Sequence, residues 1–387
     1  MFLAIFKLLA REDIKHFRLV CRLWELLGAP FLMNHVFFGP RRKIMDNFTA
    51  ISRHPIFSKS IKQIAYDVAL NDASLLDLEI YKEEFDVSYT PTDEGVYQRG
   101  LDRYREVFSD EQAILDTGED FAVLKAGMDL MPNAKSFLLS DGLRHRCLWH
   151  WYHDLDPGFW DASPAFPLSY FYSRCDRPGV SWDLRVVRSI LRAMSLSDTR
   201  VESLTLGVGG SKDRGAVPFT PTRFTGVESG HACGALRSLT KLSIQFKPNS
   251  HFNIHPQREE TRALVGWLSE AQNLAQLTLD FCPALDWDAS HELLETAVWP
   301  SLQAVRIANI RTHTFLAAGF LERHRLEADN FDFLLKGGGL EFCSGLAAST
   351  SVHLKAKSAR DKFWWCSNIK LLKMMGRGSE NHRSNDM

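Results

Sequence analysis

Leu274-Ala275-Gln276-Leu277-Thr278-Leu279 is the stretch that decides the fold. It alternates apolar and polar residues, as a half-buried strand does, and it follows a run with helical periodicity over residues 258–271. One side of such a strand is apolar and available for a core, whereas the other is available for solvent or a partner. The stretch therefore predicts a helix-then-strand unit.

The same junction recurs along the chain. Short alternating strands are expected at residues 61–66, 134–139, 201–206, 239–244 and 302–307, and a long helical run at 110–130 precedes the second of them. One unit alone cannot bury both its helix and its strand, so we expect the units to stack into a parallel sheet with outer helices. The predicted fold class is α/β, and an ordinary doubly wound α/β domain is the structural alternative.

The strands read Leu-x-x-Leu-x-Leu or close to it, and in this they are similar to irregular leucine-rich repeats. The strand centres Leu204, Leu242, Leu277 and Val305 are 38, 35 and 28 residues apart, whereas ordinary leucine-rich repeats recur every ~20–29 residues. The resemblance implies an irregular leucine-rich-repeat-like solenoid with parallel strands and outer helices, which we assign to residues 50–325.

The first forty residues show a different, fully helical pattern. Phe17, Val20, Trp24 and Leu27 recur at helical spacing, and a second apolar face is formed by Leu19, Leu23 and Leu26. Two apolar faces exceed what the core of so short a unit needs. One face is therefore expected to meet another protein, and the alternative is that both faces pack inside this chain.

These residues resemble the F-box of fungal F-box proteins. The resemblance rests on Ile5-Phe6-x-x-Leu9, Asp13-Ile14, Phe17-Arg18-Leu19-Val20-Cys21-Arg22-x-Trp24 and Ala29-Pro30-x-Leu32. It implies a trihelical module over residues 1–40 that docks on the Skp-type adaptor of a cullin-based ubiquitin ligase. The implied core and adaptor-contact positions are Ile5, Phe6, Leu9, Ile14, Val20 and Trp24. The family's opening Leu-Pro pair would precede Met1, so we expect a module truncated at its start.

An aromatic segment interrupts the repeats. Residues 147–182 hold ten aromatic side chains in 36 positions. Large, rigid aromatic side chains dominate binding hot spots, so we expect this segment to bind a protein substrate. The candidate substrate-binding residues are Trp149, Trp151, Tyr152 and Trp160. The alternative is a satellite core beneath a proline-rich loop.

Composition excludes several classes of protein. The 46 basic and 47 acidic residues give a net charge of −1, and this argues against a general nucleic-acid or membrane-surface binder. No stretch approaches the ~20 apolar residues of a membrane span, and the apolar start lacks a basic region. Seven cysteines without a Cys-x-x-Cys pair are typical of free thiols in a reducing compartment. We expect a soluble protein of the cytoplasm or nucleus.

No motif for catalysis, metal or cofactor stands out. His145, Cys147, His150, His153 and Asp154 lie close together, but no second cluster closes a four-ligand zinc site. The run Gly207-Val208-Gly209-Gly210-Ser211-Lys212 lacks the spacing of a phosphate loop. The sequence also lacks the Gly-x-Ser-x-Gly motif of a nucleophile elbow, the His-Glu-x-x-His motif of zinc proteases and the Gly-x-Gly-x-x-Gly motif of dinucleotide-binding domains. We therefore expect no enzyme, no cofactor and no metal.

The last sixty residues depart from the repeat pattern. Residues 315–324 look like another repeat helix with no strand after it, and residues 353–387 carry eight Lys/Arg against three Asp/Glu, a net +5. Residues 326–387 are thus expected to be a poorly ordered basic tail. The same segment is also interpreted as a translated intron or frameshift, and the competing interpretation is a basic tail that contacts nucleic acid or an acidic partner.

Three functional hypotheses follow. The leading one is a substrate-recognition subunit of a Skp/cullin/F-box ligase, with the Skp-type adaptor, the cullin core and a protein substrate as partners. The second is a repeat scaffold that has lost ligase docking. The third, an α/β hydrolase or transferase, has no positive support in the motifs.

Overall fold

A computed structural model describes much of the chain, as two compact units. The described residues are 6, 9, 11–17, 19–68, 70–71, 73–86, 94–140, 184–207, 222, 224–246, 254–285, 287–310, 312, 314–325, 331–335 and 352–354. Unit 1 comprises Met1–Pro218 with Gly230–Ala235, and unit 2 comprises Phe219–Ser229 with Leu236–Met387.

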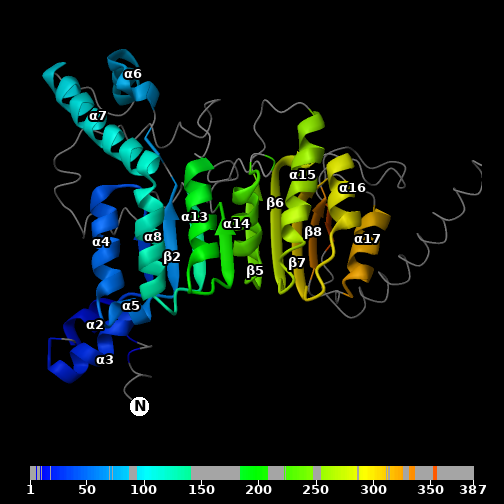
Figure 1. The fold of residues 1–387 in the computed structure, drawn as a ribbon, viewed down its shortest axis with the longest axis horizontal. Helices are drawn as coiled ribbons and strands as arrows, with labels where there is room; N and C mark the ends of the chain where they lie inside the picture. Colours follow the sequence, from blue (N-terminus) through cyan, green and yellow to red (C-terminus); the bar gives the residue numbers. More distant parts are fainter. Residues whose placement is uncertain are drawn as a thin grey trace, which may run out of the picture. The chain divides into compact units, whose positions relative to one another are not determined.

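Unit 1 begins with helices and continues with alternating strands and helices (Figure 1). Its elements are α2 (Arg11–Phe17), α3 (Arg22–Leu32), β1 (His35–Phe38), α4 (Arg42–Arg53), α5 (Phe57–Ser60), β2 (Gln63–Asp67), η1 (Ala73–Leu76), α6 (Leu78–Asp86), α7 (Glu94–Thr117), α8 (Glu119–Leu130), β3 (Ser136–Ser140), α13 (Leu184–Leu196) and β4 (Ser203–Leu206).

Unit 2 continues the alternation. Its elements are β5 (Lys241–Phe246), α15 (Ile254–Leu268), β6 (Gln276–Leu285), α16 (Trp287–Thr296), β7 (Ala304–Ile310), α17 (Thr314–Arg323), β8 (Phe331–Leu335) and β9 (Val352–Leu354). Helix α14 (Val227–Leu236) has residues in both units.

The strands of each unit pair in the order in which they occur in the chain. In unit 1, β1, β2, β3 and β4 are parallel neighbours. In unit 2, β5 to β8 are parallel neighbours, and β9 is antiparallel to β8. The α/β class is therefore confirmed. A doubly wound sheet reverses its strand order at a switch point, and the described strands of either unit do not do this.

The strand pattern repeats in burial as well as in sequence. Three apolar residues at relative positions 1, 4 and 6 are buried in each predicted unit; in β3 and the turn before it these are Ala134, Phe137 and Leu139. Each of the six predicted strands begins two residues later than expected, because its first apolar residue lies in the turn before the strand. The amide of Ala134, for example, donates to Met131 O at 3.0 Å.

A backbone contact recurs between consecutive strands. The carbonyl of Asn34 accepts the amides of Lys62 and Gln63 at 2.8 and 3.2 Å, and the carbonyl of Lys135 accepts those of Glu202 and Ser203 at 2.8 and 3.0 Å. In unit 2, the carbonyls of Thr240 and Ala275 each accept two successive amides in the same way. The strand starts are therefore equivalent in their backbone contacts as well as in their buried positions.

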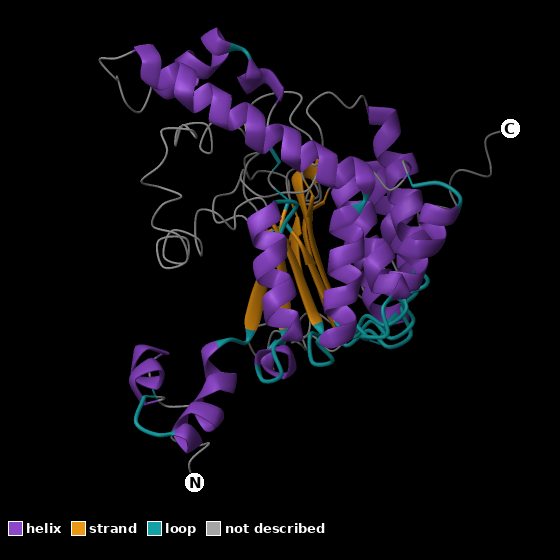
Figure 2. Cartoon of the chain, turned by 60° about the vertical axis from the view of Figure 1, so that its left-hand side comes forward, coloured by secondary structure: helices purple, strands orange, loops and turns teal. Residues whose placement is uncertain are grey.

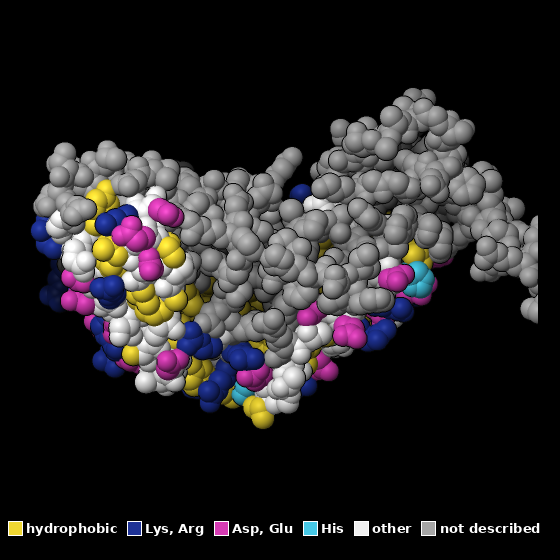
Figure 3. All heavy atoms as spheres, turned by 90° about the horizontal axis from the view of Figure 1, so that it is seen from above, with side chains coloured by type: hydrophobic (Ala, Val, Ile, Leu, Met, Phe, Trp, Pro, Cys, Tyr) yellow, Lys and Arg dark blue, Asp and Glu magenta, His cyan; other side chains and the backbone are white. Residues whose placement is uncertain are grey.

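The buried side of the strands faces the helices. Phe38 of β1 contacts Phe48 of α4, with ring centroids 4.6 Å apart, and its register partner Tyr66 at 5.1 Å. Figure 2 shows helices alongside the orange strands. Basic and acidic side chains intermingle on the coloured surface in Figure 3. Arg185 of α13 pairs with Asp116 of α7 at 2.5 Å, and Arg262 of α15 pairs with Glu292 of α16 at 3.1 Å.

Between β2 and β3 the chain inserts a helical arm, formed by η1, α6 and the first part of α7 (Figure 1). Leu75, Tyr81, Tyr97, Leu101 and Tyr104 form its own small core. The helical run expected at 110–130 is present but divided: α7 ends at Thr117, and Gly118 has the left-handed φ of 68° that separates it from α8.

The expectation that no strand follows residues 315–324 is also wrong. Strand β8 follows α17 and pairs with β7, so that Val305 lies opposite Phe331. Strand β1 was not expected either, although Val36 and Phe38 are buried at the repeat positions. In the described part of the chain, no helix is both long and apolar enough to cross a membrane.

Candidate functional site

The helices before β1 enclose an aromatic cluster. Phe6 is 1% exposed, and its ring lies 5.4 Å from that of Trp24 and 5.6 Å from that of Phe31, onto which it stacks. Phe17 packs edge-on to Trp24 at 5.5 Å. Ile14 of α2 is 3% exposed. These contacts fix α2 against α3 around a common centre.

An apolar surface lies on the turn between these helices. Leu19 is 83% exposed, Val20 70% and Leu23 57%. We call these three residues the α2–α3 patch. Ring contacts centred on the buried Phe6 hold the helices that carry it, so its side chains are presented by a packed unit. Clustered apolar side chains exposed in this way mark protein-binding surfaces.

The structure separates the predicted adaptor-contact residues into two groups. Phe6 and Ile14 are buried, and Leu9 and Trp24 are half-buried, so these four belong wholly or partly to the interior. Val20 lies on the surface. Ile5 is outside the described residues. The spacing of these residues in the sequence could not show which are buried and which are exposed, because both apolar faces recur at helical intervals.

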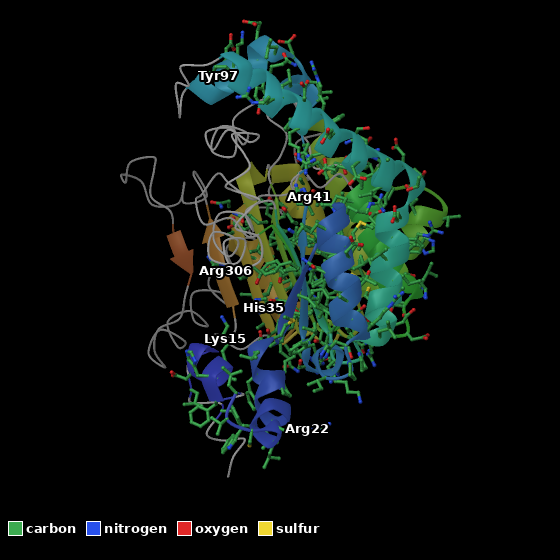
Figure 4. All side chains as sticks on the ribbon, turned by 90° about the vertical axis from the view of Figure 1, so that its left-hand side faces the viewer. Lys15, Arg22, His35, Arg41, Tyr97 and Arg306 are labelled. Atoms are coloured by element: carbon green, nitrogen blue, oxygen red, sulfur yellow. The ribbon has the colours of Figure 1, made fainter. Side chains whose placement is uncertain are left out.

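Basic side chains accompany the patch. Lys15, at the end of α2, and Arg22, at the start of α3, are exposed, and Figure 4 shows both on the helices that precede β1. Asp13 of α2 is exposed as well. The patch is therefore apolar with charged residues on both helices that carry it.

The predicted substrate-binding residues Trp149, Trp151, Tyr152 and Trp160 lie outside the described residues, as do His145, Cys147, His150, His153 and Asp154. Among the residues that the structure does describe, no three His, Cys, Asp or Glu side chains are placed to hold a metal ion.

The other side of the strands carries polar residues in both units, although the row of Phe37, Ala65 and Leu138 in unit 1 is apolar. In unit 1, Gln63 Nε2 donates to Ser136 Oγ of the next strand at 3.4 Å. In unit 2, Ser243, Thr278 and Arg306 lie in one row across β5, β6 and β7. Asn309, in the left-handed region with φ of 59°, donates its amide to Asp280 Oδ1 at 2.7 Å. These rows can offer donors and acceptors to an extended partner.

A charged cluster lies at the carboxyl ends of β1 and β2 (Figure 4). Arg41 Nη1 is 3.3 Å from Asp67 Oδ2, and Arg41 Nη2 is 3.6 Å from Glu111 Oε2. The other oxygen of Glu111 accepts the amide of Asn71 at 2.6 Å. Asp67 and Glu111 are buried, so the arginine compensates two carboxylates and joins β1, β2 and α7.

Tyr66 and Asp120 lie beside this cluster. The hydroxyl of Tyr66 donates to Asp120 Oδ2 at 3.4 Å. Burial raises the pKa of Tyr66 well above its ordinary value, and the negative charge of Asp120 adds to the effect. Burial also raises the pKa of Asp120, although a hydrogen bond from Ser189 works against it. These contacts make the cluster a structural brace between β2, α7 and α8.

Sequence reasoning missed the roles of Arg41, Asp67 and Glu111. Arg41 and Asp67 are 26 residues apart, and only strand pairing brings them together. A signal existed for Asp67 alone, since it is an acidic residue directly after an apolar strand. Leu19 and Leu23 were noted as part of a second apolar face, and the structure exposes both.

No family model matches this chain, and comparisons with curated proteins and with solved structures give no match either.

Proposed function

We propose that the chain is the substrate-recognition subunit of a Skp/cullin/F-box ubiquitin ligase, in which the N-terminal helices bind the Skp-type adaptor and the repeats bind a protein substrate. The α2–α3 patch is the observation that carries the proposal. Three exposed apolar side chains stand on helices that pack around the buried Phe6, so these side chains are available for burial against another protein. Transfer of ubiquitin would be done by other subunits.

The recurring strand starts support the repeat part of the proposal. Consecutive parallel strands with equivalent buried positions and equivalent backbone contacts are what an irregular leucine-rich-repeat-like solenoid requires. The polar strand sides, such as the row of Ser243, Thr278 and Arg306, would then form the substrate-facing surface. A ligase subunit of this kind would work in the cytoplasm or nucleus.

Binding of the full chain to a purified fungal Skp-type adaptor tests the proposal. We expect the triple variant Leu19→Ser, Val20→Ser, Leu23→Ser to weaken binding by at least about a hundredfold, since each fully buried aliphatic side chain contributes roughly 1.5–3 kcal/mol. The variant should fold normally because the three side chains are exposed.

A matched control is the double variant Leu130→Ser, Leu196→Ser, which removes exposed leucines from the ends of α8 and α13. It should bind the adaptor like the wild type. If the wild type does not bind the adaptor, the ligase assignment fails and the repeat scaffold without ligase docking is the better description. If the triple variant binds like the wild type, the patch is not the docking site.

A further inference from the structure

His324 directly follows α17 and occupies a narrow aromatic site in unit 2. Its ring centroid lies 4.3 Å from that of Phe320, one turn earlier in the helix, and 5.7 Å from that of Trp299, with which it is stacked. Trp299 belongs to the connection between α16 and β7, and both Trp299 and Phe320 are buried. The imidazole therefore joins the end of α17 to the preceding repeat.

Two hydrogen bonds define the protonation of this ring. The backbone N–H of Trp299 donates to His324 Nε2 at 3.0 Å, so Nε2 must be the acceptor. His324 Nδ1 is 2.8 Å from Phe320 O, which can only accept, so Nδ1 must carry the proton. An imidazolium carries protons on both nitrogens. Protonation would thus place an N–H on Nε2 directly against the N–H of Trp299.

The charges around the ring oppose protonation. Burial lowers the pKa of His324, and the neighbouring Arg323, whose guanidinium donates to Leu294 O, lowers it further, while the hydrogen bond to Phe320 O partly offsets both. The segment 297–303, which carries Trp299, includes no titratable side chain. On α16, Glu292 is paired with Arg262 and Arg258 of α15, and Glu295 with His291.

We propose that His324 is a pH-sensitive switch that holds the end of α17 on the α16–β7 connection when neutral and releases it when protonated. Because protonation costs more in the folded state than in the unfolded chain, the contact is fully stabilising above the ordinary histidine pKa of 6.5 and loses its contribution as the pH falls below that value. Release would expose Trp299 and Phe320, which pack against each other at 6.0 Å.

Hydrogen exchange of the Trp299 amide tests the switch directly. In the full chain between pH 7.5 and 5.5, and after correction for the intrinsic exchange rate, we expect protection to fall by up to about tenfold for each pH unit below 6.5. His324→Gln should abolish this dependence, because a glutamine amide can accept from Trp299 and donate to Phe320 without titrating. The control His291→Gln alters an exposed histidine of α16 and should behave like the wild type.

Two results would overturn the proposal: wild-type protection of Trp299 that does not change over this range, or a pH dependence that persists in His324→Gln. If His324→Gln fails to fold, ¹⁵N NMR of the His324 ring in the wild type at pH 7.5 still tests the proposal, because it shows which ring nitrogen carries the proton. A proton on Nδ1 supports the switch, and a proton on Nε2 contradicts it.

Discussion

Asp120 and Asp129 lie in the same helix, α8, but their surroundings shift the pKa values of the two carboxyl groups in opposite directions. Burial raises the pKa of Asp120. Burial also pushes the pKa of Asp129 upward, but hydrogen bonds from Lys125, Ser197 and the amide of Asp198 outweigh it, so the pKa is lowered. The ionised form of Asp120 is therefore disfavoured by folding, whereas the ionised form of Asp129 is favoured.

We therefore predict opposite effects of removing the two charges. Because the pKa of Asp120 is raised in the folded state, ionised Asp120 destabilises the protein once the pH rises through that pKa. Asp120→Asn should therefore stabilise the protein by on the order of 1 kcal/mol at pH 7, and by a smaller amount at pH 4. Asp129→Asn should destabilise it at pH 7 by a similar amount, on the order of 1 kcal/mol, and converge with the wild type as the pH falls below the ordinary aspartate value. Urea unfolding at both pH values measures this, and shifts of the same sign would contradict it.

At the scale of elements, α8 packs closely on α4. A methyl group at Gly127 of α8 would lie 2.1 Å from Phe48 Cε1 of α4, and Phe48 is fully buried against Phe38. Phe48 would have to move within a packed core. We predict that Gly127→Ala destabilises the protein by roughly 1–3 kcal/mol, the usual cost of overpacking.

Gly266 of α15 is the matched control. It also lies inside a helix, but nothing is within 4 Å of the position its methyl group would take. Gly266→Ala should therefore stabilise the protein by about 0.5–1 kcal/mol through helix propensity alone. Thermal unfolding of both variants compares the two effects. A Gly127→Ala variant as stable as the wild type would mean that α4 and α8 do not approach this closely.

The elements differ in how far the sequence could predict them. The strands from β2 to β7 were found because an apolar residue recurs at positions such as Leu274, Leu277 and Leu279, and local alternation is enough to identify a strand. The periodic run at 110–130 gave no sign of where α7 ends and α8 begins, because Gly118 sits inside a continuous helical pattern. The brace formed by Arg41 was missed because it depends on which strands pair, and periodicity does not report pairing.

The candidate docking site, the α2–α3 patch, could also be predicted only in part from the sequence. Helical spacing identified two apolar faces in the first forty residues. It could not show that Phe6 takes the interior of the cluster while Leu19 and Val20 remain on the surface, since this depends on how α2 and α3 pack. The sequence therefore predicted the kind of surface, and the tertiary packing decided its residues.

For the whole molecule, consecutive parallel strands imply that stability is transmitted mainly between neighbours. Leu139 of β3 and Leu279 of β6 occupy equivalent positions in the two units, and both are completely buried. Replacing either by alanine should cost about 2–5 kcal/mol. In stacked repeats, the total stability is roughly the sum of the intrinsic stability of each repeat and the interaction energies between neighbouring repeats. We therefore predict that the two substitutions damage different strands.

Hydrogen exchange mass spectrometry of the full chain measures this difference. Leu139→Ala should reduce protection most in β2, β3 and β4, and Leu279→Ala should reduce it most in β5, β6 and β7, because these strands pair directly with the altered ones. Each variant serves as the control for the other, since both remove the same atoms from equivalent sites. Equal losses across both units in either variant would mean that the chain unfolds as one cooperative domain, and nearest-neighbour contacts between strands would then not govern its stability.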